Sequence, residues 1–193
     1  MIDEFTKKEI EKISFDLLTQ SKAIDVFPTP VEKILGYTEL KVDDKISSLD
    51  IHPSFLEKLK DSSLKILQSG LGKIKGIFDR DQKTIFVDNS LNSNTGKKNF
   101  VELHEIGHGV LPWQNQIVMA LDNNETLNEE VEEQFEREAN YFASITLFQQ
   151  DRFIDQASKM EIGLDTVLGL KHKFGASVHA TFRNYVLTSN KIC

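Results

Sequence analysis

The sequence has few of the features that mark secreted, membrane-spanning or disordered proteins. Its 193 residues include one cysteine, Cys193, so no disulfide can form within the chain, which suits a reducing compartment. The first eight residues contain no apolar signal core. The most apolar stretch, 141–148, is far shorter than the roughly 20 residues that span a bilayer. With ordinary counts of 10 Gly and 4 Pro, extensive disorder is not expected. We therefore expect a cytoplasmic protein without a membrane segment.

Positively charged residues are outnumbered by negatively charged ones. Lysine and arginine number 23 against 30 aspartates and glutamates, so the net charge is −7. Such a chain is a poor general binder of phosphate backbones, and we do not expect direct nucleic-acid binding. Only the C-terminal segment is mildly basic, through Lys171, Lys173 and Arg183. The length fits one domain, at about 100–200 residues per domain, and an acidic, cysteine-poor surface is compatible with a monomer.

Hydrophobic periodicity predicts an α+β fold that is mostly helical with a small sheet. Apolar residues at helical spacing predict helices over the ranges 3–25, 30–36, 53–69, 96–110, 126–150 and 178–188. Two β-rich runs, 73–78 and 84–87, flank a turn and predict a hairpin. Residues 113–124 are expected to form a connection. We expect a single domain over 1–193, with 1–25 as an N-terminal helical extension and 151–193 as a helical C-terminal segment.

The strongest chemical signal is an H-E-I-G-H motif, residues 104–108, within the predicted helix over 96–110. Residues four apart share a helix face, so the imidazoles of His104 and His108 can reach one tetrahedral ion. Zn²⁺ suits this nitrogen-rich set, and Mn²⁺ or Fe²⁺ can use it as well. Glu105 follows the first histidine and can take a proton from a water that the metal activates. H-E-x-x-H is short and also arises by chance, so the metal interpretation needs a further ligand.

A catalytic zinc usually has three protein ligands and one open position, so a third ligand is expected downstream. The predicted helix over 126–150 carries six glutamates, most of which must belong to a solvated face. Glu136 shares its helical face with small residues, which would let this helix lie close to the motif helix. We therefore rank Glu136 first as the third ligand, with Glu138 and Glu133 as alternatives. Asn140, on the same face, could support a ligand histidine through its second ring nitrogen.

Together these residues resemble the ImmA/IrrE-type metallopeptidase family, whose pattern pairs H-E-x-G-H with E-x-x-A-x-x-F-A. The second motif is here E-R-E-A-N-Y-F-A, residues 136–143, beginning 28 residues after His108. The resemblance covers roughly residues 25–190, including a C-terminal end that is helix-turn-helix-like. It implies a gluzincin-like zinc protease with His104, His108 and Glu136 as ligands and Glu105 as general base. The stretch after Ala143 departs from the Leu-Leu-Met-Pro-like sequence that often follows in the family.

The resemblance also implies a biological role, because members cleave or inactivate a helix-turn-helix transcriptional repressor in mobile elements or stress responses. We therefore expect a zinc-dependent endopeptidase that hydrolyses a peptide bond in a partner repressor. The substrate is expected to bind as an extended segment along a sheet edge. Two alternatives stay open: a metal-containing anti-repressor that acts by contact without cleavage, and a DNA-binding regulator with a structural metal.

Three further residues have two interpretations each. His172 and His179 could each stabilise an oxyanion from across the cleft, and the alternative is an ordinary surface histidine. Trp113, which follows a proline, could line the cleft or plug the core. We favour the core position for Trp113.

Overall fold

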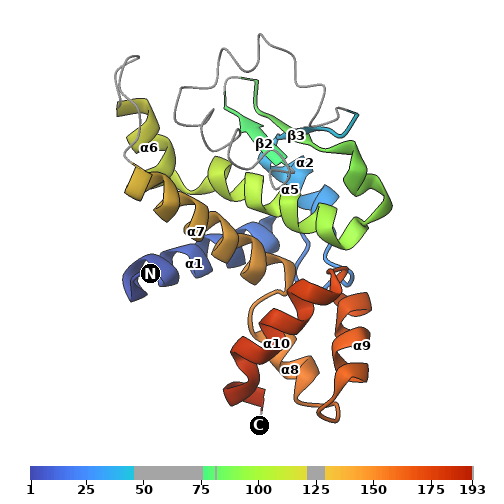
Figure 1. The fold of residues 1–193 in the computed structure, drawn as a ribbon. Helices are drawn as coiled ribbons and strands as arrows, with labels where there is room; N and C mark the ends of the chain where they lie inside the picture. The colour runs from blue at the N-terminus through green and yellow to red at the C-terminus, as the bar shows by residue number, and fades with distance from the viewer. Residues whose placement is uncertain (46–75, 81, 121–128, 193) are drawn as a thin grey trace.

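The computed structural model describes residues 1–45, 76–80, 82–120 and 129–192. The helix expected over 53–69 and the start of the first predicted strand lie outside the described residues. The described part is mostly helical and carries a small sheet above the helix that bears the H-E-I-G-H motif (Figure 1). This confirms the expected α+β fold class.

The sheet has three strands in the order β1-β3-β2. β2 (Gly76–Asp79) and β3 (Thr84–Val87) pair antiparallel, with Phe78 opposite Ile85, which is the predicted hairpin. β1 (Lys41–Asp43) pairs parallel with β3 and was not anticipated, because three residues are too few to show a period. The middle strand is the most buried, and Ile85 is fully inaccessible to solvent. β2 is therefore an end strand of the described sheet.

Two long helices form the centre of the molecule, and both were predicted. α5 (Thr95–Val110) begins after Asn94, whose side-chain oxygen accepts a hydrogen bond from a backbone N–H of the first turn. α7 (Glu129–Leu147) lies alongside it (Figure 1). Between them stands α6 (Pro112–Ala120), where we expected a connection. That expectation was wrong. The first N–H groups of a helix have no partner within the helix, so a proline, which has no N–H, is well tolerated there, and Pro112 starts a helix.

Two helices precede the sheet, and they pack against the central pair, the first on α7 and the second on α5 (Figure 1). α1 (Glu4–Gln20) begins after Asp3, whose carboxylate accepts hydrogen bonds from two backbone N–H groups of the first turn. It ends five residues before the predicted position, because the segment that follows turns sharply, with positive φ at Lys22 and Asp25. α2 (Val31–Thr38) continues two residues past its predicted end.

The chain ends in three helices, α8 (Asp151–Ala157), α9 (Leu164–Phe174) and α10 (Val178–Ile192). They form the lower part of the molecule in Figure 1. α7 stops short of residue 150 because Gln149 and Gln150 both adopt positive φ. A helical C-terminal segment was expected; its helix-turn-helix character and the single-domain organisation stay predictions. No helix among the described residues is long and apolar enough to cross a membrane.

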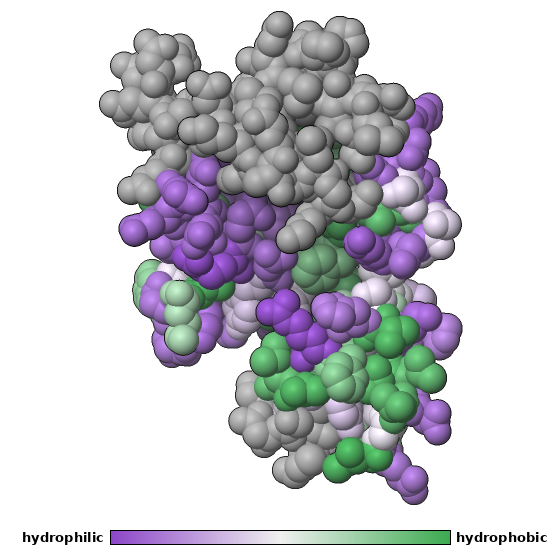
Figure 2. Space-filling model, in the orientation of Figure 1, coloured by the Kyte–Doolittle hydropathy of each residue, from purple (hydrophilic) through white to green (hydrophobic). Residues whose placement is uncertain are grey.

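The hydrophobic core runs continuously from α1 to the start of α10. Where the core reaches the C-terminal helices, it contains a group of phenylalanine rings that contact one another, namely Phe27, Phe148, Phe153 and Phe174. Figure 2 shows apolar side chains on the outside of the C-terminal helices as well. Those of α10 that are clearly exposed are Val178, Phe182, Val186 and Leu187.

Candidate metal centre

Close packing of α5 against α7 sets the position of the centre. At Gly107, an added Cβ would lie 3.1 Å from the Phe142 ring and 3.3 Å from Cα of Ala139. Those distances are shorter than most side-chain contacts, so a larger residue would push the two helices slightly apart where they cross. The small residues predicted to bring the helices together therefore do so.

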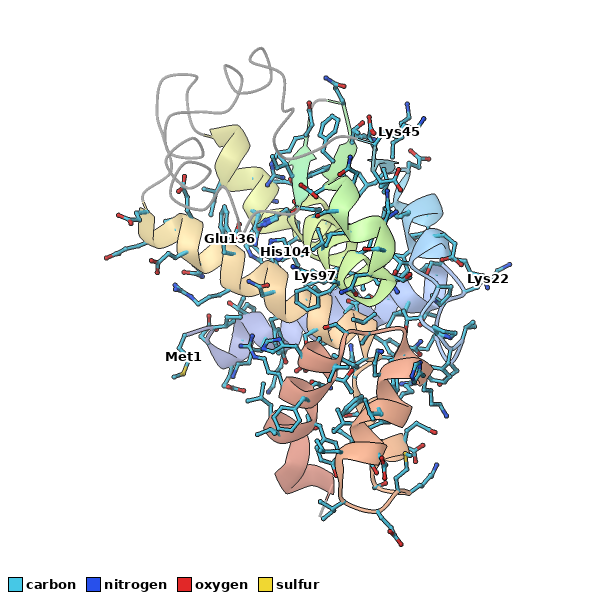
Figure 3. The ribbon with its side chains drawn as sticks, turned by 45° about the vertical axis from the view of Figure 1, so that its right-hand side comes forward. Met1, Lys22, Lys45, Lys97, His104 and Glu136 are labelled. Carbon is cyan, nitrogen blue, oxygen red and sulfur yellow. The ribbon has the colours of Figure 1, made fainter. Side chains whose placement is uncertain are left out.

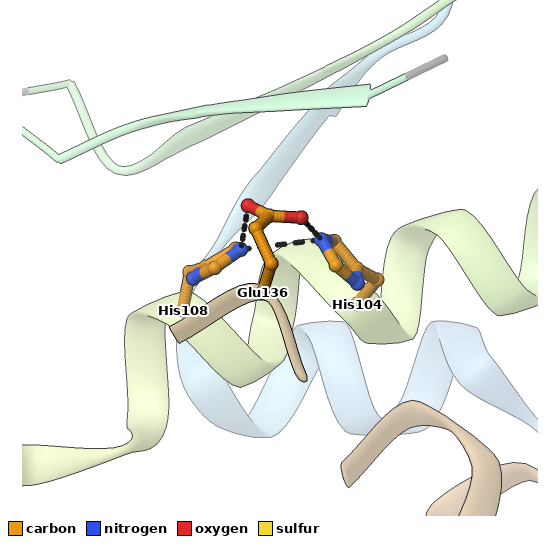
Figure 4. Close-up of side chains that lie close together, drawn as sticks. All are labelled: His104, His108 and Glu136. Carbon is orange, nitrogen blue, oxygen red and sulfur yellow. Dashed lines mark hydrogen bonds and ion pairs between the residues drawn. The ribbon is translucent and has the colours of Figure 1, made fainter. Parts of the chain in front are cut away.

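Three side chains meet at this crossing (Figures 3 and 4). Nε2 of His104 lies 3.2 Å from Nε2 of His108. The two oxygens of Glu136 face one histidine each, at 3.3 Å in both cases. Metal bonds of about 2.0–2.1 Å in a tetrahedron place neighbouring ligand atoms about 3.3–3.4 Å apart. The spacing of the three side chains therefore matches a tetrahedral ion, and the donor set fits Zn²⁺. Within the described residues, no other group of three or more such ligands was found.

Electrostatic interactions within the triad keep Glu136 ionised. Burial alone would raise the pKa of this carboxyl, but hydrogen bonds and charge interactions with both histidines outweigh it and hold the pKa far below its usual value. Burial lowers the pKa of His104, but Glu136 and the charge of Glu105 outweigh that effect and leave it raised. A deprotonated carboxylate is the form that binds a metal, so Glu136 is ready to do so at neutral pH.

Glu105 lies on the side of α5 that faces the sheet. An added Cβ at Gly76 of β2 would lie 2.5 Å from Cγ1 of Val101 and 2.8 Å from Oε1 of Glu105, so any larger residue there would have to displace these α5 side chains. The Glu105 carboxyl is almost wholly buried, and burial raises its pKa, against the opposing charges of the two histidines. A carboxyl whose pKa is raised above its usual value is better able to accept a proton and hold it.

Each of the three candidate glutamates on α7 has a different environment. Glu136 faces the histidines, whereas Glu133 is exposed and pairs with Arg137 at 3.0 Å. Glu138 is buried and accepts hydrogen bonds from Trp113 and Gln114, both of α6. The structure thus brings Glu136, and neither alternative, to the histidines.

The remaining predicted residues differ in whether they contact the triad. The Asn140 side chain donates to the backbone oxygen of Glu136 at 2.8 Å, and its hydrogen bond to His104 contributes to the raised pKa of that histidine. Its supporting role stays a prediction. His172 on α9 and His179 on α10 are exposed, and no described interaction joins either of them to the triad. Trp113 is half-buried against the core, which agrees with the favoured interpretation.

Sequence reasoning missed the side chains that surround His108. Its Nδ1 lies 2.9 Å from Oε1 of Gln114, and its backbone oxygen accepts a hydrogen bond from Arg80 at 2.9 Å. Arg80 also donates to Asn115, whose amide donates to the backbone oxygen of Gly109. Gln114 and Asn115 belong to α6, which we expected to be a connection, so no pattern pointed to them.

The match to a family model agrees with this geometry. The model of the IrrE N-terminal-like domain, which describes the M78 peptidases, matches residues 60–183. The chain belongs to the M78 peptidase family. Comparison with curated proteins gave no match. Membership in the M78 family confirms the resemblance seen in the sequence and implies a metallopeptidase-like domain that acts on protein.

Proposed function

We propose that this M78 family member is a zinc-dependent endopeptidase that cuts a peptide bond in a partner protein. The observation that carries the proposal is the convergence of His104, His108 and Glu136, with Glu105 buried beside them. Two imidazole nitrogens and a carboxylate oxygen form a donor set that zinc favours, and Mn²⁺ or Fe²⁺ would accept the same set.

Each residue of the centre has a definite task. His104 and His108 would hold the ion through Nε2, and Glu136 through a carboxylate oxygen. The ion, when bound, supplies a Lewis acid that polarises the scissile carbonyl and lowers the pKa of water. Glu105 takes a proton from the attacking water and passes it to the nitrogen of the leaving amine. Because burial raises its pKa, Glu105 can hold that proton between the two transfers.

The sheet offers a place for an extended substrate. β2 is an end strand among the described strands, and it packs against α5 beside Glu105. A peptide that paired with its outer edge would run past the metal centre, with backbone hydrogen bonds holding it in register. This arrangement supports the expectation of an extended substrate.

Resemblance to the ImmA/IrrE-type proteins supports a helix-turn-helix transcriptional repressor as the substrate, and the single cysteine supports the cytoplasm as the location. A repressor could also be disabled by contact alone, and a DNA-binding regulator with a structural metal is the other alternative. The experiments below separate these possibilities.

The metal content of the purified protein tests the centre directly. We expect about one zinc per chain in the wild type and its loss in both His104→Ala and Glu136→Ala. Glu133→Ala, on the exposed face of the same helix, is the matched control and should keep the metal. A wild-type protein that holds no metal after reconstitution with zinc or manganese would overturn the proposal.

Glu105→Gln separates cleavage from contact. This variant should keep the zinc but lose hydrolysis by about 10²–10⁴-fold, because the general base is gone. The measurement is fragment formation from purified helix-turn-helix repressors, detected by mass spectrometry. Relief of repression that persists in Glu105→Gln would show a contact mechanism, and salt-dependent DNA binding by the protein would indicate a DNA-binding regulator.

A further inference from the structure

A buried chain of hydrogen bonds leads away from the metal centre through His108. Its Nδ1 lies 2.9 Å from Oε1 of Gln114, and Nε2 of Gln114 donates to Oε2 of Glu138 at 2.9 Å. Gln114 is 0% exposed and Glu138 is 1% exposed. The chain therefore joins three helices: α5 carries the histidine, α6 the glutamine and α7 the glutamate.

Donor and acceptor counting fixes the orientation of the Gln114 amide. The Glu138 carboxylate receives two further N–H donors, Nε1 of Trp113 at 2.7 Å and Nε2 of Gln134 at 2.9 Å. With only donors around it, this carboxylate must face the NH₂ end of Gln114. Nε2 of Gln114 also donates its second hydrogen to the backbone oxygen of Phe135, with 3.3 Å between the nitrogen and the oxygen. The amide oxygen of Gln114 is thus left to face His108.

The orientation of this amide determines the tautomer of His108. A carbonyl oxygen only accepts hydrogen bonds, so Nδ1 of His108 must carry the proton. Nε2, which faces His104 and Glu136, is thereby left as the ring atom that can give a lone pair to an ion. A ligand histidine whose second nitrogen is held in this way has a fixed ring orientation and coordinates through a fixed atom.

We propose that Gln114 and Glu138 are positioning residues of the metal centre, which hold His108 in the tautomer that presents Nε2 to the ion. The inference rests on the proposed metal site and adds to it Gln114, which no sequence pattern indicated, and Glu138, which faces away from the histidines and so is not a ligand. Glu138 is two residues from Glu136 on α7, so the two side chains point to roughly opposite sides of the helix. One helix thereby supplies both a ligand and the support of another ligand.

The first test removes the acceptor at position 114. Gln114→Met keeps a similar volume but offers no oxygen to Nδ1, and we expect zinc affinity to fall about 10–100-fold. Affinity is measured by competition with a chromophoric chelator. The matched control is Gln134→Met, which removes a donor to Glu138 without a link to His108, and it should bind zinc as the wild type does.

The second test separates positioning from general stability. NMR of the zinc-bound protein should show the Nδ1–H proton of His108 exchanging slowly with water in the wild type and in Gln134→Met, because it is hydrogen-bonded to Oε1 of Gln114. The same proton should exchange faster in Gln114→Met. Loss of packing elsewhere in the fold would not by itself expose that single proton.

A pair of variants at position 138 provides a graded comparison. Glu138→Met removes the acceptor that orients the Gln114 amide, because Gln114 donates to Oε2 of Glu138, so zinc binding should weaken. Glu138→Gln can keep an oxygen for both Trp113 and Gln114, so it should bind zinc more tightly than Glu138→Met.

The outcomes distinguish this inference from the proposed function. Equal zinc affinity in Gln114→Met and the wild type, or a Glu138→Gln variant no better than Glu138→Met, would overturn the inference and leave the metal site standing. A wild-type protein that binds no zinc would overturn the proposed function itself.

Discussion

The centre of the molecule and its C-terminal helices bury different kinds of side chain. Where α5, α6 and α7 meet, the buried groups include Glu105, Gln114 and Glu138, and polar partners surround them. Among the C-terminal helices, the buried contacts are mainly between aromatic rings, as in the pair Phe153 and Phe174 with centroids 5.4 Å apart. Buried polar groups require partners in fixed directions, whereas apolar contacts need only shape. The centre therefore depends on polar partners in fixed directions, and the C-terminal helices depend on the fit of apolar side chains.

The comparison predicts that a core change in the C-terminal helices will affect stability without affecting the metal. Phe174→Ala removes a fully buried ring that contacts three other rings, and it should cost about 3–5 kcal/mol of unfolding free energy. Urea unfolding measures the loss. Zinc affinity of the folded protein should stay at the wild-type value, and its collapse in a folded Phe174→Ala protein would show that the two regions are coupled.

Two mid-helix glycines provide a matched pair. Gly107→Val places methyl groups against the backbone and the Phe142 ring at the α5–α7 crossing, so we expect a loss of about 1–3 kcal/mol and weaker zinc binding. Gly169→Val in α9 meets only the flexible end of Met160 and should leave both properties nearly unchanged. Thermal unfolding and chelator competition measure the pair. Equal effects at the two glycines would show that the neighbours of Gly107 give way as easily as the flexible end of Met160.

A surface ion pair of the C-terminal helices should have a small effect. Arg152 on α8 donates to Asp25 at 2.9 Å, and this interaction holds the pKa of Asp25 below its usual value. Because the pair is partly exposed, Asp25→Asn should cost less than about 1 kcal/mol. Because folding lowers the pKa of Asp25, the ion pair contributes its full stability at pH values above the unfolded pKa. That contribution is lost as the pH falls through the folded pKa. The difference between variant and wild type should therefore vanish in acid, and a difference that grew there would contradict the assignment.

The exposed histidines of the C-terminal helices should matter least. His172→Ala and His179→Ala lie outside the triad, and each should change zinc affinity and cleavage rate by less than about two-fold. A much lower cleavage rate at unchanged zinc affinity would instead support the oxyanion role considered from the sequence. The measurement is the rate of fragment formation beside chelator competition.

Local patterns in the sequence were enough to predict much of this protein. The spacing of His104 and His108, the helix that carries them and the β2–β3 hairpin all follow from neighbours within a few residues. The preference for Glu136 over Glu138 also came from a local argument, since one helical face carries the small residues that permit close packing. Side-chain direction along a helix is regular, so such arguments hold at a distance of several turns.

Only the tertiary structure decided which groups surround the centre. β1 pairs with β3 across more than forty residues, and Gln114 meets Glu138 because α6 folds back toward α7. Neither contact leaves a periodic signal, because each depends on how separate elements pack. The sequence by itself determined the residues that can bind a metal and activate water, since their chemistry and helical spacing are local. The packing of α5, α6 and α7 brought His104, His108 and Glu136 to ligand distance and turned Nε2 of His108 toward the site, since such positions depend on contacts between distant parts of the chain.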